Sequence, residues 1–137
     1  MNEAIWGVDH NEAIYYKPNL LAPWPHVLGF LKQVEVGEMG VFGVDADNEI
    51  WYRLGTNENS GDIGTGWQKL PGLLKHISVG TNNVWGVNPD DEIYSMENVT
   101  FVSSEIQLSW KLMEGSLKQI AVISSPPLLP GLYFCLI

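Results

Sequence analysis

A tryptophan recurs every 43 residues in this chain, at Trp24, Trp67 and Trp110. After each tryptophan the same residue types return in the same order: a glycine five positions later, then a leucine, a lysine and a β-branched residue. A fixed spacing combined with a fixed order of residue types predicts tandem copies of one structural unit.

A second motif alternates with the first and consists of an aromatic residue, glycine and valine, followed by a polar turn and an isoleucine–aromatic pair. Its three glycines are 36 and 43 residues apart, so the first connection between motifs is seven residues shorter. Variable length between constant motifs is typical of a loop. The three copies begin at Trp6, Phe42 and Trp85.

Each unit contains short segments with the period-two pattern of a β-strand. In residues 73–79 this alternation places Leu73, Ile77 and Val79 on one side. Residues 84–87 and 92–94 flank a polar cluster that suits a hairpin turn. Amphipathic stretches long enough for crossover helices are missing. The sequence therefore predicts an all-β protein with four short strands per unit, which is the size of a β-propeller blade.

Counting strands gives about three blades: a half blade at 5–16, whole blades at 24–52 and 67–95, and a half blade at 110–122. Residues 1–122 form the repeat segment, and residues 123–137 form an apolar tail without repeat character. Propellers contain about four to eight blades. We therefore expect a homo-oligomer, a fragment of a longer propeller, or a chain with exposed sheet edges.

The recurring residues have structural interpretations. We expect each repeated tryptophan to fill the wedge between adjacent blades, and each following glycine to permit close approach of another backbone. The repeated lysines should lay their stems over apolar surface with the ammonium in water, a sugar contact being the alternative. The triplet at 98–100 is a glycosylation acceptor in an expected loop.

The formal net charge of −9 excludes two partner classes. Such an acidic surface repels phosphate backbones and anionic lipids, so we expect neither nucleic acid binding nor membrane insertion. The single cysteine, Cys135, rules out an internal disulfide, and no signal peptide is visible at the start of the sequence.

At these motifs the sequence resembles the tectonin repeat, and in particular the fish-egg lectins and tachylectin-like proteins. The resemblance covers roughly residues 4–122 and is strongest at 66–80, 84–88 and 91–94. It implies a propeller lectin for N-acetylglucosamine-type sugars and bacterial envelope glycans such as lipopolysaccharide, usually secreted and serving innate defence. The alternative is an intracellular protein-interaction propeller, a form that tectonin repeats also take.

Sugar binding requires an aromatic face for the apolar side of the ring and polar groups for its hydroxyls. Segments between the predicted blades supply both, and buried packing of the aromatic residues is the alternative interpretation. The third unit replaces the segment 52–56 with 95–101, which changes any site that uses this loop. The carbohydrate-binding candidates are Tyr15, Tyr16, Asn19, Trp51, Tyr52, Arg53, Asn57, Asn59 and Tyr94.

Metal and catalytic signatures are weak. Asp45, Asp47 and Glu49 have the opening spacing of a calcium loop, but Ile50 stands where that loop needs glycine, so Asx-turns are the favoured interpretation. The three histidines lie at no metal-binding spacing. The acidic residues fall in repeated turns, and no catalytic motif occurs, so we expect a binding protein without a cofactor rather than an enzyme.

Overall fold

The computed structural model describes residues 4–57, 59 and 61–123. Among these residues it contains β-strands, turns and loops, and no helix. The all-β prediction is therefore confirmed for the described part of the chain. The strands are β1 (Ile5–Val8), β2 (Ala13–Lys17), β3 (His26–Phe30), β4 (Gln33–Gly37), β5 (Gly40–Val44), β6 (Glu49–Arg53), β7 (Trp67–Leu73), β8 (His76–Val79), β9 (Val84–Val87), β10 (Glu92–Val102) and β11 (Glu105–Ser116).

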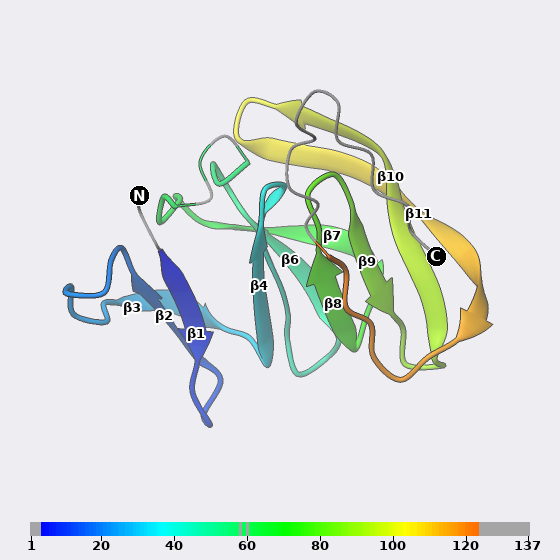
Figure 1. Cartoon of the computed structure of the whole chain (residues 1–137), viewed down its shortest axis with the longest axis horizontal. Helices are drawn as coiled ribbons and strands as arrows, with labels where there is room; N and C mark the ends of the chain where they lie inside the picture. Colours follow the sequence, from blue (N-terminus) through cyan, green and yellow to red (C-terminus); the bar gives the residue numbers. More distant parts are fainter. Residues whose placement is uncertain (1–3, 58, 60, 124–137) are drawn as a thin grey trace, which may run out of the picture.

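The strands form three antiparallel sheets that follow one another along the chain. The first sheet contains β1–β3, the second β4–β7 and the third β8–β11, each with its strands in sequence order. Figure 1 shows the second sheet between the other two, and β4 lies beside both β1 and β8. Successive sheets packed side by side are consistent with propeller blades.

The sheets begin and end at different residues from the predicted blades. The prediction joined the strand after each repeated tryptophan to the segment that follows it, but β3 pairs with β2 and β7 pairs with β6. The reason is a glycine in the left-handed region, at φ 116° in Gly29 and 89° in Gly72, near the end of each of these strands. There the chain turns and enters the next sheet.

The predicted single strand at 73–79 is consequently divided between two sheets. Leu73 ends β7 and is 52% exposed, whereas Ile77 and Val79 are buried in β8. The expectation that these three side chains share one face is therefore wrong. The predicted hairpin at 84–94 is confirmed, because β9 and β10 flank the turn.

The inner strands of the second and third sheets are β4 and β8, the first strand of each sheet. A leucine just before each of them fixes that strand to its sheet. Leu31 and Leu74, each 2% exposed, lie against the glycine of the second strand of their sheets. A Cβ added at Gly43 would stand 2.5 Å from Leu31 Cδ1, and one at Gly86 would stand 2.3 Å from Leu74 Cδ1. Any larger residue at these glycines would displace the leucine from the core.

The core consists of two clusters, one on each side of the second sheet. One joins the first and second sheets through residues such as Ile14 and Val41, and the other joins the second and third through residues such as Ile50 and Ile77. These four side chains are fully buried. Each contributes about 1.5–3 kcal/mol relative to exposure, so sheet-to-sheet packing is a main source of stability.

The third sheet differs from the second at its outer hairpin. In the second sheet Arg53 ends β6 and a long connection leads to β7, whereas β10 continues to Val102 and turns directly into β11. The exposed Asn98 therefore lies on β10, with its Nδ2 donating to Ser109 Oγ at 3.1 Å, and not in the predicted loop. The predicted tail, apart from residue 123, lies outside the described residues.

Replacing Gly72 with alanine should lower the free energy of unfolding by about 1–2 kcal/mol, because φ is 89° at this position and an L side chain is strained there. Gly66→Ala is the matched control, since its added Cβ meets the nearest atom at 3.6 Å without a positive φ. Denaturant unfolding measures both variants. Equal stability of the two would contradict the proposed role of Gly72.

Candidate functional site

The repeated tryptophans bridge neighbouring sheets. Trp67 on β7 donates its indole N–H to the carbonyl of Leu28 on β3 at 3.0 Å, and Trp110 on β11 donates to Pro71 on β7 at 2.8 Å. The predicted wedge position of these two residues is therefore confirmed. The glycine prediction is corrected, because a Cβ added at Gly29 would meet the Trp67 indole nitrogen at 3.3 Å, with no backbone atom among its nearest neighbours.

Two pockets occupy equivalent places between the sheets. The first, of about 350 Å³, lies between the first and second sheets, and the other, of about 410 Å³, lies between the second and third. Both volumes fall in the range of small-molecule sites. The first is lined by Glu12, Ile14, Gly29, Phe30, Leu31, Asp45, Ala46, Asp47, Trp51 and Trp67. The second is lined by Ile50, Gly72, Leu73, Leu74, Asn88, Pro89, Asp90, Tyr94 and Trp110.

The lining residues are nearly all repeat equivalents. Each pocket receives an isoleucine and a glycine from one sheet, a leucine from the segment that leads into the next sheet, and a second aromatic residue, a tryptophan and a polar turn from that next sheet. The second aromatic is Trp51 in the first pocket and Tyr94 in the second. The repeat therefore builds the same kind of aromatic, partly acidic hollow twice.

Asp45, at the start of the turn between β5 and β6, fixes one side of the first pocket through its hydrogen bonds. Asp45 Oδ1 accepts the amide N–H groups of Asp47 and Glu49 at 3.0 and 2.9 Å, and its Oδ2 accepts the Trp51 indole N–H at 3.0 Å. This is the Asx-turn that the sequence favoured over calcium. It orients the Trp51 ring at the pocket without help from a ligand.

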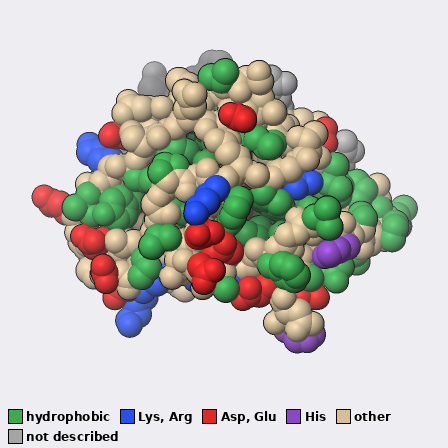
Figure 2. Space-filling view, turned by 180° about the vertical axis from the view of Figure 1, so that it is seen from behind, with side chains coloured by type: hydrophobic (Ala, Val, Ile, Leu, Met, Phe, Trp, Pro, Cys, Tyr) green, Lys and Arg blue, Asp and Glu red, His purple; other side chains and the backbone are tan. Residues whose placement is uncertain are grey.

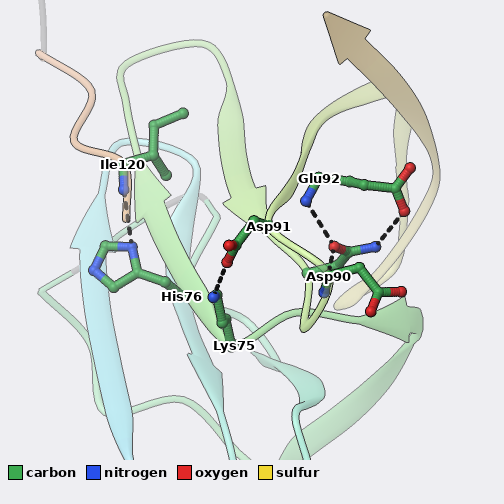
Figure 3. A network of polar contacts seen from close by, with 7 residues as sticks. Lys75, His76, Asp90, Asp91, Glu92 and Ile120 are labelled. Carbon is green, nitrogen blue, oxygen red and sulfur yellow. Dashed lines mark hydrogen bonds and ion pairs between the residues drawn. The ribbon is translucent and has the colours of Figure 1, made fainter. Parts of the chain in front are cut away.

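Asparagine replaces that aspartate in the second pocket. Asn88 Oδ1 accepts the amide N–H groups of Asp90 and Glu92, and its Nδ2 donates to Glu92 Oε1 at 3.0 Å (Figure 3). The same turn therefore forms with a neutral residue. The two pockets share geometry and differ in charge and in the aromatic residue that each presents.

A carboxylate stands at the mouth of each pocket, from Asp47 in the first and Asp90 in the second. Both residues are exposed, and within the described part of the chain their carboxylates accept no hydrogen bond. Figure 3 shows the Asp90 carboxylate directed away from the hydrogen bonds of its own turn. These oxygens can accept hydrogen bonds from hydroxyl or amide groups of a bound molecule.

Two of the repeated lysines are tied to the same turns. Lys75 forms an ion pair with Asp91 (Figure 3), and Lys32 donates to the Asn48 side chain. In Lys32 and Lys75 the ammonium group therefore binds a turn residue, which corrects for these two the expectation of an ammonium in water, whereas Lys118 is exposed. The two bound lysines clamp the strand that enters a sheet to the hairpin of that sheet.

Three turn aspartates have pKa values below the ordinary one. The amide N–H of Ala13 is the main cause at Asp9, and the Lys75 side chain is the main cause at Asp91. At Asp45 burial acts to raise the pKa, but the hydrogen bonds from Trp51 and from the turn amides outweigh it. The folded state therefore favours the ionised form of all three carboxyl groups.

Three of the predicted sugar contacts are buried. Tyr16 donates its hydroxyl to the Gly61 carbonyl at 2.5 Å, and Tyr52 donates to Asn57 Oδ1 at 3.1 Å. Arg53 donates from Nε to the Ile63 carbonyl at 2.8 Å, and its guanidinium lies 5.0 Å from the centre of the Trp67 ring. These side chains hold loops and pack between sheets, and they do not line either pocket.

The remaining candidates are divided between turns and the open hollow at the N-terminal sheet. Asn19 and Asn59 accept backbone N–H groups in exposed turns, and Asn57 accepts from a tyrosine. Tyr15 lines an open hollow of about 420 Å³ with Gly7, Val8, Asp9 and Trp24. Of the nine predicted residues, the structure therefore brings Trp51 and Tyr94 into the two equivalent pockets and leaves Tyr15 at this third hollow.

The predicted sugar contacts do not include the tryptophan, isoleucine or turn carboxylate of either pocket, although the tryptophans were expected as wedge residues and Asp47 as a calcium candidate. The prediction selected adjacent aromatic and polar residues along one segment, although a strand directs neighbouring side chains to opposite faces. The usable signal was the repeat itself, because Trp51 and Tyr94 occupy the same repeat position and so do Asp47 and Asp90.

Two further findings concern the described residues alone. They contain no group of three or more histidine, cysteine, aspartate or glutamate residues placed to hold a metal ion, so Asp45, Asp47 and Glu49 form no such cluster. They also contain no helix long and apolar enough to cross a membrane.

Asp45→Asn should lower the free energy of unfolding by about 1–3 kcal/mol at neutral pH, because the new amide N–H₂ faces the Trp51 indole N–H. The lowered pKa of Asp45 means that its contribution is present above the ordinary value of 3.8 and is lost as pH falls through the lower folded-state value. The difference between wild type and variant, measured by denaturant unfolding, should therefore shrink in acid. Asp47→Asn is the control and should stay within about 0.5 kcal/mol of wild type, and a pH-independent difference for Asp45→Asn would contradict the assignment.

The sequence matches a known protein family over most of its length. A family model described as the Tectonin domain matches residues 2–126, a span that includes all eleven strands. No curated protein matches the chain. Because the family model covers most of the sequence, the chain belongs to the tectonin family.

Proposed function

We propose that this protein is a non-catalytic lectin that binds N-acetylglucosamine-type sugars of bacterial envelope glycans through the pockets between its sheets. The observation that carries the proposal is the repetition of one pocket design, with two aromatic residues beside a free carboxylate. A pocket built twice from equivalent residues suits a ligand that itself repeats, such as a polysaccharide.

The chemistry of the pocket suits an amino sugar. The rings of Trp51 and Trp67, or of Tyr94 and Trp110, can stack against the apolar face of a pyranose. The mouth carboxylates can accept hydrogen bonds from ring hydroxyls or from an acetamido N–H. The exposed side chain of Phe30 in the first pocket, or of Leu73 in the second, can offer an apolar surface to the acetamido methyl group.

Charge narrows the choice among envelope glycans. The net charge of −9 and the acidic mouths of the pockets oppose phosphate-bearing groups, such as those of lipopolysaccharide. We therefore expect uncharged N-acetylhexosamine units to bind better than anionic ones. Two weak sites on one molecule would bind a polymer with avidity, which fits a secreted protein of innate defence.

A second candidate function, protein interaction, is favoured by a separate observation, the exposed hydrophobic side chains. The N-terminal sheet and the loop before β3 expose several large hydrophobic side chains, and Figure 2 shows hydrophobic side chains on this side of the molecule. An apolar surface of this kind is typical of protein contacts and favours an interaction propeller. The exposed residues are Leu20, Leu21, Trp24, Leu28 and Phe30.

Replacing both Trp51 and Tyr94 with alanine should weaken binding to a chitin oligosaccharide by at least about tenfold, because each pocket loses one stacking surface. Each single variant should retain binding at the other pocket with reduced avidity. Isothermal titration with chitotetraose and a glycan array measure the affinity and the preferred sugar.

Gln107→Ala, at an exposed position of β11 that lines neither pocket, is the control and should bind like wild type. Failure of the wild-type protein to bind chitin, chitotetraose or bacterial cells would overturn the lectin proposal and favour the protein-interaction function. Unchanged binding in the double variant would show that sugars bind outside these pockets.

A further inference from the structure

The first sheet begins at the position of a second strand. Its strand β1 carries the aromatic–glycine–valine motif that β5 and β9 carry in the other sheets, where β4 and β8 precede them as inner strands. Residues 117–122 repeat the sequence of those inner strands, but they pair with no strand in the described part of the chain. Among the described residues the first sheet thus has no inner strand, and residues 117–122 have the sequence of an inner strand without a sheet of their own.

Residues 117–122 already lie in the place of an inner strand, beside β8 (Figure 1). The Leu117 amide donates to the Asp91 carbonyl at 3.0 Å, as the corresponding leucine amides do in the other sheets. The Ile120 amide donates to His76 Nδ1 at 3.3 Å (Figure 3). The segment is therefore positioned with one edge still open for a sheet.

Leu117 and Gly7 correspond to the leucine and the glycine that contact each other in the other two sheets, but here each lacks that contact. The corresponding leucines of the second and third sheets are 2% exposed and rest on the glycine of the adjacent strand. Leu117 is 43% exposed, and a Cβ added at Gly7 would find no atom of the described residues within 4 Å. Among the described residues Leu117 therefore has no glycine to pack on, and Gly7, in the first sheet, has no leucine packed on it.

Polar groups complete the same pattern. In the second sheet the Lys32 amide N–H donates to the carbonyl of Val44, at the end of β5, at 2.9 Å. In the third sheet Lys75 donates in the same way to Val87, at the end of β9, at 2.8 Å. Each lysine also binds the turn residue of that hairpin through its ammonium group. The equivalent groups here are Lys118 on one side and Val8 and Glu12 on the other, which would add a pair of opposite charges.

The open hollow at the N-terminal sheet is half of a third pocket. Asp9, Tyr15 and Trp24 correspond to one wall of the intact pockets, whose other wall includes an isoleucine and a glycine of the preceding sheet. Those equivalents are Ile93 and Gly115, on the last sheet. Trp24 is 47% exposed, while its two counterparts donate to carbonyls of a neighbouring sheet.

We propose that residues 117–122 of one copy complete the first sheet of a second copy, and that this junction builds the third pocket. Two copies joined reciprocally, each with three sheets, would close a ring of six, a size that propellers accept. The junction joins different surfaces of the two copies and forms twice. The sugar specificity of the third pocket rests on the proposed function, whereas the assembly does not.

Sedimentation of the full chain at micromolar concentration tests the assembly and should give twice the chain mass of 15.3 kDa. Gly7→Val should raise the dimer dissociation constant by at least about tenfold, because the added side chain fills the place of the incoming leucine. Within one chain that position is empty, so the variant should keep the circular dichroism and thermal stability of the isolated monomer.

Leu117→Asp should break the same junction from its other side. Mixing the two variants restores one intact junction, since each retains the edge that the other has lost, and a heterodimer should appear that neither variant forms alone. Gly66→Ala is the control and should dimerise like wild type, because its added Cβ makes an ordinary contact.

Binding stoichiometry tests the third pocket separately. The wild-type dimer should bind three chitotetraose molecules per chain, and a folded Gly7→Val monomer should bind two. A folded wild-type monomer, or a dimer that both variants leave intact, would overturn the proposed junction. If no form binds the sugar while the variants still dissociate the dimer, the lectin proposal fails and the assembly stands.

Discussion

The hydrogen bond from a repeated tryptophan to the preceding sheet sets the spacing on which the rest of the structure depends. Trp67 and Trp110 lie on outer strands, and each indole donates to a carbonyl on the outer strand of the neighbouring sheet. The ring can lie there because the residue beside it is a glycine with positive φ, Gly29 or Gly72. The same ring then forms part of the pocket, so the contact that joins two sheets also forms the candidate binding surface.

Much of this arrangement could be predicted from the sequence, because the recurrence of Trp67 and Trp110 reports a structural unit directly. The division into sheets could not, since it depends on the positive φ of Gly72, and periodicity alone does not show that residues 73–79 cross from one sheet to another. The pocket residues were partly predicted through Trp51 and Tyr94. Burial of Arg53 depends on packing against a distant tryptophan, which no local pattern reports.

Arg53 also explains why the second and third sheets differ outside the pockets. Its side chain holds the long connection between β6 and β7 through the Ile63 carbonyl. The equivalent position in the third sheet is Met96, which is buried but can offer no such hydrogen bonds. There the strand continues and the connection becomes a short hairpin. The loss of this arginine therefore accompanies a different outer loop, while the pocket, which uses other positions, is retained.

The proposed closure between two copies is based on the equivalence of the two junctions within the chain. The two junctions in the structure use the same leucine, glycine and tryptophan contacts, so they turn the chain by similar steps from one sheet to the next. Three such steps within one chain would have to bring Leu117 to Gly7, and propellers of fewer than about four blades do not close around a channel. A second copy meets the same requirement without changing the step. In the proposed dimer the open edge of the first sheet and the unfinished pocket at Trp24 have one physical explanation, because the same strand of the second copy would complete both.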